Sequence, residues 1–279
     1  MSIDVHFLNV GQGNMVVIIF PDQKVMVYDC NITEENEENV FAYLQKIMPK
    51  NEIDVFVNSH READHMGGIK ELHKKYNIKQ LWDSGVSGNT DTPEYQEYMD
   101  FRRNVGYLEE VKPNRYWAIK PNVKILNGKR EGLDDPNAQS IVIHINNKGS
   151  SVLLTGDTDA KVWKDYIMLE SYRPAFGVYS NLKSSILLAS HHGSISFFGD
   201  PKSPYTKHIS TINPDITIIS VGEKNSYNHP DDDAIKLYKE YSEGAINNGE
   251  KIFRTDVMGN IKAELKDDGN CYLSRINNL

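Results

Sequence analysis

The sequence predicts an α/β protein in which two β-sheets pack face to face and helices cover their outer faces. Short apolar runs separated by turn residues in the first third indicate strands of a meander. Farther along, such runs alternate with segments that carry apolar residues at helical spacing. Because strands occur in both halves of the chain, with helices between and after them, two packed sheets with outer helices satisfy the pattern. We therefore expect residues 1–279 to form one domain.

The first half begins with strands and continues with alternating helices and strands. A helix is predicted over Glu34–Met48, because Thr33 precedes it, acidic residues fill its first turn and Pro49 follows it. The strands expected before this helix are Ile3–Val10, Met15–Phe20 and Lys24–Tyr28. The elements expected after it are strand Ile53–Val57, helix Met66–Tyr76 and strand Ile78–Trp82.

The pattern weakens between Ser84 and Pro121. This segment contains Gly85, Gly88 and an acidic and aromatic run, Glu94–Phe101, without a clear period. We expect an insertion of short helices and loops at about residues 84–121, which forms a lid or rim of a pocket.

Regular patterns return in the second half. Helices are predicted from about Ala160 to Glu170 and from Asp231 to Tyr241, with a helix-poor loop up to Lys202. The strands expected here are Ser140–Ile145, Ser151–Thr155, Ser184–Ala189, Ile216–Val221, Lys251–Arg254, Ile261–Leu265 and Cys271–Arg275.

Composition narrows the class of protein. A chain of 279 residues with 39% hydrophobic and 25% charged residues is typical of a globular protein. No apolar run is long enough for a membrane span and no secretion signal opens the chain, so we expect a cytoplasmic protein without a membrane partner. A net charge of −8 argues against binding of nucleic acid through the overall field, although it leaves room for a local basic groove. The spacing of Cys30 and Cys271 indicates neither a disulfide framework nor a zinc ribbon.

The strand predicted at Ile53–Val57 runs into a polar loop. His60, Glu62, Asp64 and His65 supply two imidazoles and two carboxylates within six residues, which are donors that divalent metals accept. Taken alone, the cluster is equally compatible with a charged surface loop.

Three more polar clusters follow predicted strands. Asp157 ends one strand, where its alternative role is to cap the following helix. His191 and His192 end another, and His229 lies in a polar segment after a third. Because four such coincidences are hard to explain as surface decoration, the sequence predicts a metal site built from strand ends.

These segments resemble the metallo-β-lactamase superfamily and, within it, the hydrolase domain of the ComEC/Rec2 competence proteins. The matching segments run in order through nearly the whole chain: Val10-Gly11-Gln12-Gly13, Asp29, His60 to His65 for an HxDxDH motif, Thr155-Gly156-Asp157, His191 to Ser194, Ser220 to Pro230, and Phe253-Arg254-Thr255-Asp256 with Gly259. The resemblance implies a four-layer αββα sandwich and a stand-alone, metal-dependent hydrolase.

The resemblance also implies a site for one or two divalent ions, with Asp157 bridging them. Its oxygen-rich donors suit zinc or manganese, and iron is possible. We favour His192 over His191 as a ligand, although alternation along a strand end allows the reverse, and both could be structural. The implied metal ligands are His60, Glu62, Asp64, His65, Asp157 and His192.

Two departures from the family pattern concern one of the two ion positions. Glu62 stands where this branch has Asp, although its longer arm can still reach a metal. Where the wider superfamily has a further histidine ligand, this chain offers Asp134-Asp135-Pro136-Asn137. The position formed by His60, Glu62 and Asp157 is therefore poor in nitrogen ligands.

The resemblance assigns catalytic roles to Asp64, His191 and His229. His191 would contact a metal ligand or a phosphate, and His229 would donate a proton to an anionic oxygen or the leaving group. For His229 the alternative is a histidine that is hydrogen-bonded in a loop before Pro230.

The leading functional hypothesis is a phosphodiesterase or nuclease that uses a metal-activated water. Its substrate would be an anionic phosphodiester, with nucleic acid and nucleotides as possibilities. One alternative is hydrolysis of a carboxylic ester, thioester or lactam on the same fold. Another is a degenerate, metal-poor binding or effector module with partner proteins in a multi-component system. The oligomeric state is left open.

Overall fold

A computed structural model describes residues 1–117, 120–171, 181–246 and 248–276. Within these residues, two large sheets account for most strands. The first has the order β18-β17-β1-β2-β3-β6-β8-β9 and comprises β1 (Ser2–Phe7), β2 (Val16–Ile19), β3 (Val25–Tyr28), β6 (Val55–Val57), β8 (Gln80–Asp83), β9 (Tyr107–Glu110), β17 (Asn260–Lys266) and β18 (Cys271–Ile276). The second has the order β10-β11-β12-β13-β14-β15-β16 and comprises β10 (Arg115–Trp117), β11 (Lys120–Asn127), β12 (Val142–Asn147), β13 (Ser150–Leu154), β14 (Ile186–Leu188), β15 (Ile216–Ile219) and β16 (Ile252–Arg254).

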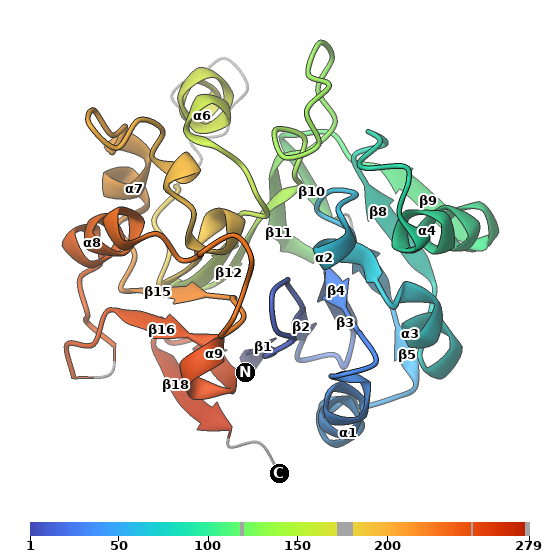
Figure 1. Ribbon diagram of the computed structural model, residues 1–279. Helices are drawn as coiled ribbons and strands as arrows, with labels where there is room; N and C mark the ends of the chain where they lie inside the picture. Colours follow the sequence, from blue (N-terminus) through green and yellow to red (C-terminus); the bar gives the residue numbers. More distant parts are fainter. Residues whose placement is uncertain (118–119, 172–180, 247, 277–279) are drawn as a thin grey trace.

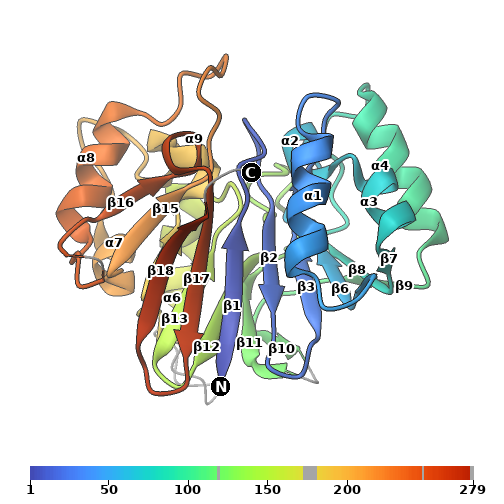
Figure 2. The ribbon, with the colours of Figure 1, turned by 90° about the horizontal axis from the view of Figure 1, so that it is seen from below.

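Helices cover the outer faces of both sheets (Figures 1 and 2). On the side of the first sheet lie α1 (Glu37–Ile47), α2 (Ala63–Met66), α3 (Ile69–Lys75) and α4 (Pro93–Asn104). On the side of the second lie α5 (Ala160–Val162), a π-helical turn (Trp163–Ile167), α6 (Met168–Ser171), α7 (Lys207–Ile212) and α8 (Asp232–Tyr241). The short elements are β4 (Cys30–Asn31), β5 (Glu52–Ile53), β7 (Asn77–Ile78), α9 (Thr255–Met258) and the 3₁₀ turns Ser190–Gly193 and Ile195–Phe197. The predicted four-layer class is thereby confirmed. Among the described residues, no helix combines the length and apolar character needed to cross a membrane.

The layering follows from the alternation of side chains along each strand. In β3, Met26 and Tyr28 point into the core between the sheets, whereas Val25 and Val27 pack against the helices outside. Because successive side chains of a strand point to opposite faces, a strand that is buried on both faces reads as a continuous apolar run. Every residue of β3 is buried, which explains why the strand is apolar throughout.

Parallel strands bring the functional loops to one edge of each sheet. β3, β6, β8 and β9 are mutually parallel, as are β13, β14, β15 and β16. The carboxyl ends of parallel neighbours lie on the same side, so the loops that follow them meet there. Cross-sheet hydrogen bonds join the two edges, since the Tyr28 hydroxyl donates to the Ile141 carbonyl at 2.7 Å and the Ile141 amide donates to the Ser59 carbonyl at 2.9 Å.

The predicted helix over Met66–Tyr76 is in fact two helices, α2 and α3. Gly68 separates them with a left-handed backbone (φ 72°), and a Cβ atom there would lie 2.5 Å from the Ile32 carbonyl oxygen. A glycine is required at such a position, so the helical spacing could not continue through it. Similarly, α1 begins at Glu37 rather than Glu34, because Asn36 accepts a hydrogen bond from the Thr33 amide in a turn before the helix.

The expectation of short helices and loops between Ser84 and Pro121 is wrong. The segment contains the twelve-residue helix α4 and supplies β9 and β10, which are edge strands of the two sheets, and residues 118 and 119 lie outside the described part. Thr92 caps α4 by accepting a hydrogen bond from the Tyr95 amide, and Pro93 occupies the first turn. Strand β11 and helix α7 were also not predicted.

Helix α4 is tied to the polar loop after β6 by a buried carboxylate. Asp83, which is fully buried at the end of β8, accepts hydrogen bonds from Arg61 (2.8 Å), Tyr98 (2.9 Å) and Arg102 (2.8 Å) through one oxygen. Arg61 lies between His60 and Glu62 in the loop and is itself 4% exposed. The segment 84–121, which showed no clear period in the sequence, is thus connected to the loop through Asp83.

Replacing Asp83 with Ala should lower the free energy of unfolding by about 3–5 kcal/mol, because it leaves the buried Arg61 guanidinium without a counter-charge. Urea unfolding in the presence of a chelator measures this. The control is Asp100→Asn, which removes a carboxylate from an exposed pair with Arg103 and should cost less than about 1 kcal/mol. Equal losses for both variants would contradict a bracing role for Asp83.

Candidate metal centre

The centre of the site is His65, a buried imidazole in α2. Its Nδ1 atom lies 2.8 Å from Asp29 Oδ2, at the end of β3. Its Nε2 atom faces the other way and lies 3.3 Å from Asp157 Oδ1, 3.9 Å from Asp64 Oδ1 and 3.2 Å from His192 Nε2. His65 therefore stands between a buried carboxylate that orients it and a group of donors from its own helix and from the ends of β13 and β14.

Two further buried histidines of the site, His60 and His192, have the same arrangement. His192 Nδ1 donates to the Ser220 carbonyl at 2.9 Å, and His60 Nδ1 lies 3.0 Å from Ser59 Oγ. In both rings Nε2 is left facing Asp157, at 3.9 Å and 3.7 Å from its Oδ2 atom. A metal-binding histidine characteristically uses one ring nitrogen for the metal and the other for a protein acceptor that fixes its orientation.

Two groups of side chains have the spacing of metal ligands. One comprises His60, His65 and Asp157, and the other comprises Asp64, His65 and His192; within each, one donor atom per residue lies within 4.8 Å of the others. His60 Nε2 is buried and has no hydrogen-bond partner among the described residues, as expected of a nitrogen that binds a cation. Imidazole and carboxylate donors suit a divalent metal ion.

Charges at the centre also favour a cation. Burial disfavours a charged His65, but the carboxylates of Asp157, Asp64 and Asp29 outweigh burial and hold the pKa of His65 well above its ordinary value. Conversely, burial together with the neighbouring charge of His65 lowers the pKa of His60 to about 3. A bound divalent ion would supply the positive charge that these carboxylates otherwise draw onto His65.

The paired histidines owe their positions to an unusual backbone. His191 and His192 both have left-handed φ angles, 51° and 53°. Such conformations cost of the order of 1 kcal/mol or more for residues with a Cβ and cluster at functional sites. Alternation along an extended strand would separate the two rings, whereas here His191 Nε2 and His192 Nε2 lie 3.6 Å and 3.9 Å from the same Asp157 oxygen. Of the two, His192 belongs to a ligand group and His191 does not.

Glu62, His191 and His229 lie around the ligand groups rather than within them. All three line a pocket of about 210 Å³ above Asp64 and Asp157. Burial and the Asp64 charge raise the pKa of Glu62, whose carboxylate belongs to neither ligand group in the described chain. The pocket is also lined by Asp135, Pro136 and Asn137, the segment that stands where the superfamily has a further histidine.

His229 packs edge to face against His191 in the lining of this pocket. Their ring centroids are 5.6 Å apart, and Tyr227 stacks on His229 at 6.0 Å. Burial lowers the pKa of His229, partly offset by Asp231, whose Oδ2 atom lies 3.9 Å from His229 Nδ1. A neutral imidazole at this position has one N–H that can donate to a bound anion.

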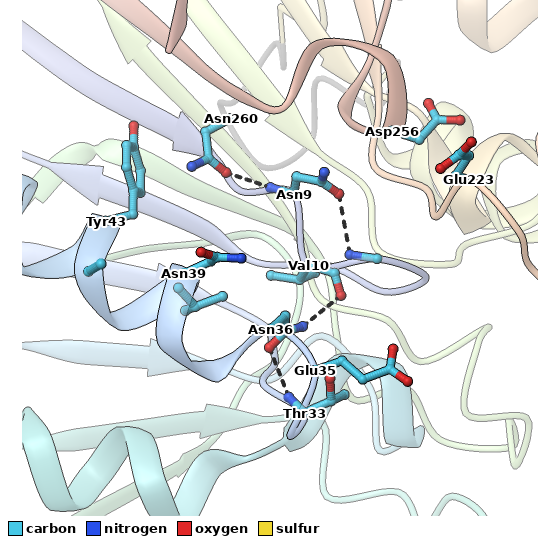
Figure 3. Close-up of a pocket in the computed structure, with 13 residues that line it drawn as sticks. Asn9, Val10, Thr33, Glu35, Asn36, Asn39, Tyr43, Glu223, Asp256 and Asn260 are labelled. Carbon is cyan, nitrogen blue, oxygen red and sulfur yellow. Dashed lines mark hydrogen bonds between the residues drawn. The ribbon is translucent and has the colours of Figure 1, made fainter. Parts of the chain in front are cut away.

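The loop Gly11-Gln12-Gly13 contributes Gln12 to the lining of the metal pocket. Hydrogen bonds of the residues just before it hold the loop in place. Val10 and Gly11 also line a second pocket of about 340 Å³. Figure 3 shows the residues of this pocket, where the Asn9 amide donates to Asn260 Oδ1 at 2.8 Å and Asn36 Nδ2 donates to the Val10 carbonyl at 2.9 Å. At Gly13 a Cβ atom would lie 2.6 Å from the Asp64 carbonyl oxygen. The close approach presents Gln12 to the metal pocket, which it lines.

A family model described as the metallo-β-lactamase superfamily matches residues 8–191, a span that includes the strand ends described above as far as His191. The chain belongs to this superfamily. Membership supports a metal-dependent hydrolase, and the superfamily fold implies the binding of divalent metal at the His and Asp groups.

Curated relatives confirm the ComEC/Rec2-like character. ComE operon protein 3 of Bacillus subtilis (strain 168) is 24% identical over 95% of this chain, and the competence protein ComA of Neisseria gonorrhoeae is 23% identical over 93%. The matches cover 33% and 32% of those proteins, so the chain spans about a third of the length of the relatives it matches.

A solved structure shares the fold at low sequence identity. Igni18, described as a novel metallo hydrolase from the hyperthermophilic archaeon Ignicoccus hospitalis KIN4/I, has a TM-score of 0.53 and 11% identity. The similarity covers 98% of this chain and 100% of that one. It shows that the fold extends over nearly the whole chain.

Sequence reasoning left Asp29 and Ser59 without a role. Asp29 follows β3 as Asp157 follows β13, so its position at a strand end was a usable signal. Ser59 carried none, because its function is to donate to Asp29 through both its amide (2.6 Å) and its hydroxyl (2.9 Å).

Replacing Asp157 with Asn should lower metal affinity by at least about 100-fold, because its carboxylate approaches every histidine of both ligand groups. Elemental analysis after dialysis against a metal buffer measures the bound ions per chain. The matched control is Asp135→Asn, which removes a carboxylate from the same pocket but from neither ligand group. A control that loses as much metal as Asp157→Asn would contradict the assignment.

Replacing Asp29 with Asn should weaken metal binding by about 10–100-fold without removing a ligand, because His65 loses the acceptor that orients it. Titration with a competing chelator gives the affinity. Unchanged affinity in a folded Asp29→Asn protein would show that α2 packing alone orients His65.

Proposed function

We propose that the chain hydrolyses a phosphodiester with the help of one or two divalent ions, zinc or manganese, with iron as a further candidate. The observation that carries this proposal is the pair His191 and His229, which line the pocket beside Asp157 without belonging to a ligand group. Imidazole N–H groups beside a cation offer strong hydrogen bonds to anionic oxygens, as a phosphodiester needs.

The ions would be held by His60, His65 and Asp157 and by Asp64, His65 and His192. When bound, they supply an activated water and neutralise charge on the phosphoryl oxygens.

The residues of the chain bind the substrate and orient the attacking water. His191, whose Nδ1 lies 3.2 Å from Ser196 Oγ, presents Nε2 to the pocket and donates to a phosphoryl oxygen. His229, whose ring packs against that of His191, donates a hydrogen bond from its neutral imidazole to the leaving oxygen. Asp64, whose carboxylate lines the pocket, orients the attacking water by accepting a hydrogen bond from it, and the proton that this water loses passes to solvent.

The relatives bear on the kind of phosphodiester. One that matches 94% of this chain at 25% identity is named recombination protein 2, from Haemophilus influenzae (strain ATCC 51907 / DSM 11121 / KW20 / Rd). A nuclease therefore belongs to the proposal alongside a phosphodiesterase that acts on a smaller ester. Partner proteins in a multi-component system and a cytoplasmic location stay predictions from the sequence.

Replacing His229 with Ala should lower kcat on bis-p-nitrophenyl phosphate by about 100-fold while the metal content stays unchanged, because the anionic transition state loses a hydrogen-bond donor. Steady-state kinetics and elemental analysis on one preparation measure both quantities. The control His73→Ala changes a histidine of α3 that does not line the pocket.

The same preparation tests the proposal against its alternatives. Inactivity of the metal-loaded protein on single-stranded DNA, RNA and bis-p-nitrophenyl phosphate would contradict the proposed function. Hydrolysis of carboxylic esters or thioesters that survives His229→Ala would instead identify an acyl hydrolase on the same fold.

A further inference from the structure

A groove of about 930 Å³ leads away from the metal pocket along α2 and α4, which lie side by side (Figure 1). It shares Gln12, Glu62, Asp64 and Tyr227 with the pocket, so one substrate can occupy both. Any group attached to the phosphorus on this side of the pocket would lie in the groove.

The far part of the groove is acidic. Glu34, before α1, and Glu94 and Glu97, on the first two turns of α4, line it beyond the carboxylates at the centre. None of the three forms an ion pair with another residue in the described chain. Among the described lining residues, Lys224 is the single Lys or Arg. Carboxylates that line a cleft without internal partners create a negative potential that attracts a cationic ligand.

An aromatic ring lies where the groove joins the pocket. Tyr227 is 64% exposed, stacks on His229 with an interplanar angle of 13° and lines both cavities. An exposed aromatic ring close to carboxylates is a common recognition element for organic ammonium groups. The Tyr227 ring therefore favours a cationic group, as the glutamates do.

This lining is unsuited to a nucleic acid strand. Proteins bind the phosphate backbone by neutralising it with Lys and Arg, and these residues supply most of the affinity. The lining of the metal pocket adds Asp135 and contains no Lys or Arg among the described residues. A strand that passed through the pocket and the groove would meet carboxylates in both.

Building on the proposed phosphodiesterase activity, we infer that the groove binds a positively charged part of the substrate. The substrate class is then a compact phosphodiester in which one alcohol carries an amine or a quaternary ammonium group. The phosphorus lies over the metal groups, and the cation lies among Tyr227, Glu94 and Glu97 with Glu34 nearby.

Two substrates that differ only in charge test the inference. p-Nitrophenyl phosphocholine carries a quaternary ammonium, and p-nitrophenyl 3,3-dimethylbutyl phosphate replaces its nitrogen with carbon and keeps the leaving group. We expect kcat/KM to be at least about tenfold higher for the charged ester. Rising ionic strength should reduce this ratio, because salt screens exposed charges. A ratio near one in the wild-type protein would overturn the inference.

A variant that removes two groove carboxylates tests whether the preference for the charged ester arises in the groove. In Glu94→Gln/Glu97→Gln the ratio should fall by about threefold to tenfold toward one, since two carboxylates are lost. The matched control Glu38→Gln/Glu240→Gln removes two exposed carboxylates outside the groove and should keep the wild-type ratio. Because the ratio is measured within one preparation, partial misfolding does not affect it. An unchanged ratio in the groove variant would refute the site.

The outcomes separate this inference from the proposed function. Hydrolysis of bis-p-nitrophenyl phosphate without a preference for the charged ester refutes the groove site alone. No hydrolysis of any phosphodiester by the metal-loaded protein refutes the proposed function. Inhibition by a single-stranded oligonucleotide at lower concentration than by phosphocholine would assign the groove to nucleic acid and overturn the inference.

Discussion

The site depends on the buried carboxylate of Asp29. A fully buried carboxylate is stable only when its oxygens are paired, and the partners of Asp29 are the Ser59 amide and hydroxyl, the Asn14 side chain and the His65 ring. These groups come from the strand edge and from both ends of the polar loop. Asp29 therefore fixes the loop and, through His65, aims an imidazole nitrogen at Asp157.

Contacts between the two sheets bring the remaining metal donors to His65. The hydrogen bond from Ile141 to Ser59 sets the second sheet against the loop of the first, and the hydrogen bond from the Asp157 amide to Ser140 Oγ (3.1 Å) fixes Asp157 beside this contact. Ser220 donates to the Gly13 carbonyl at 2.9 Å on the other side. The donors of the two ligand groups lie within reach of one another because the sheets are joined at this edge, so the inter-sheet core is also a condition for the chemistry.

The metal centre and the groove beside it differ in the charge of the groups that they favour. Imidazoles and carboxylates at the centre suit a divalent cation, and His191 and His229 face the space where an anion would lie. Outside them the lining is acidic, in keeping with the net charge of −8. An anionic reacting group with a cationic neighbour satisfies both zones, which a polyanion does not.

The sequence by itself determined the layers and most of the polar strand ends, because alternation and apolar runs depend on local periodicity. It indicated Asp157 and His192 for the same reason. It did not predict α4 or the edge strands β9 and β10, since edge strands are partly exposed and lack a continuous apolar run. Only the tertiary structure decided that Glu62 stays outside the ligand groups, that left-handed backbone brings His191 and His192 to one oxygen, and that Asp83 braces Arg61. These features depend on distances between residues far apart in the chain, which local patterns do not encode.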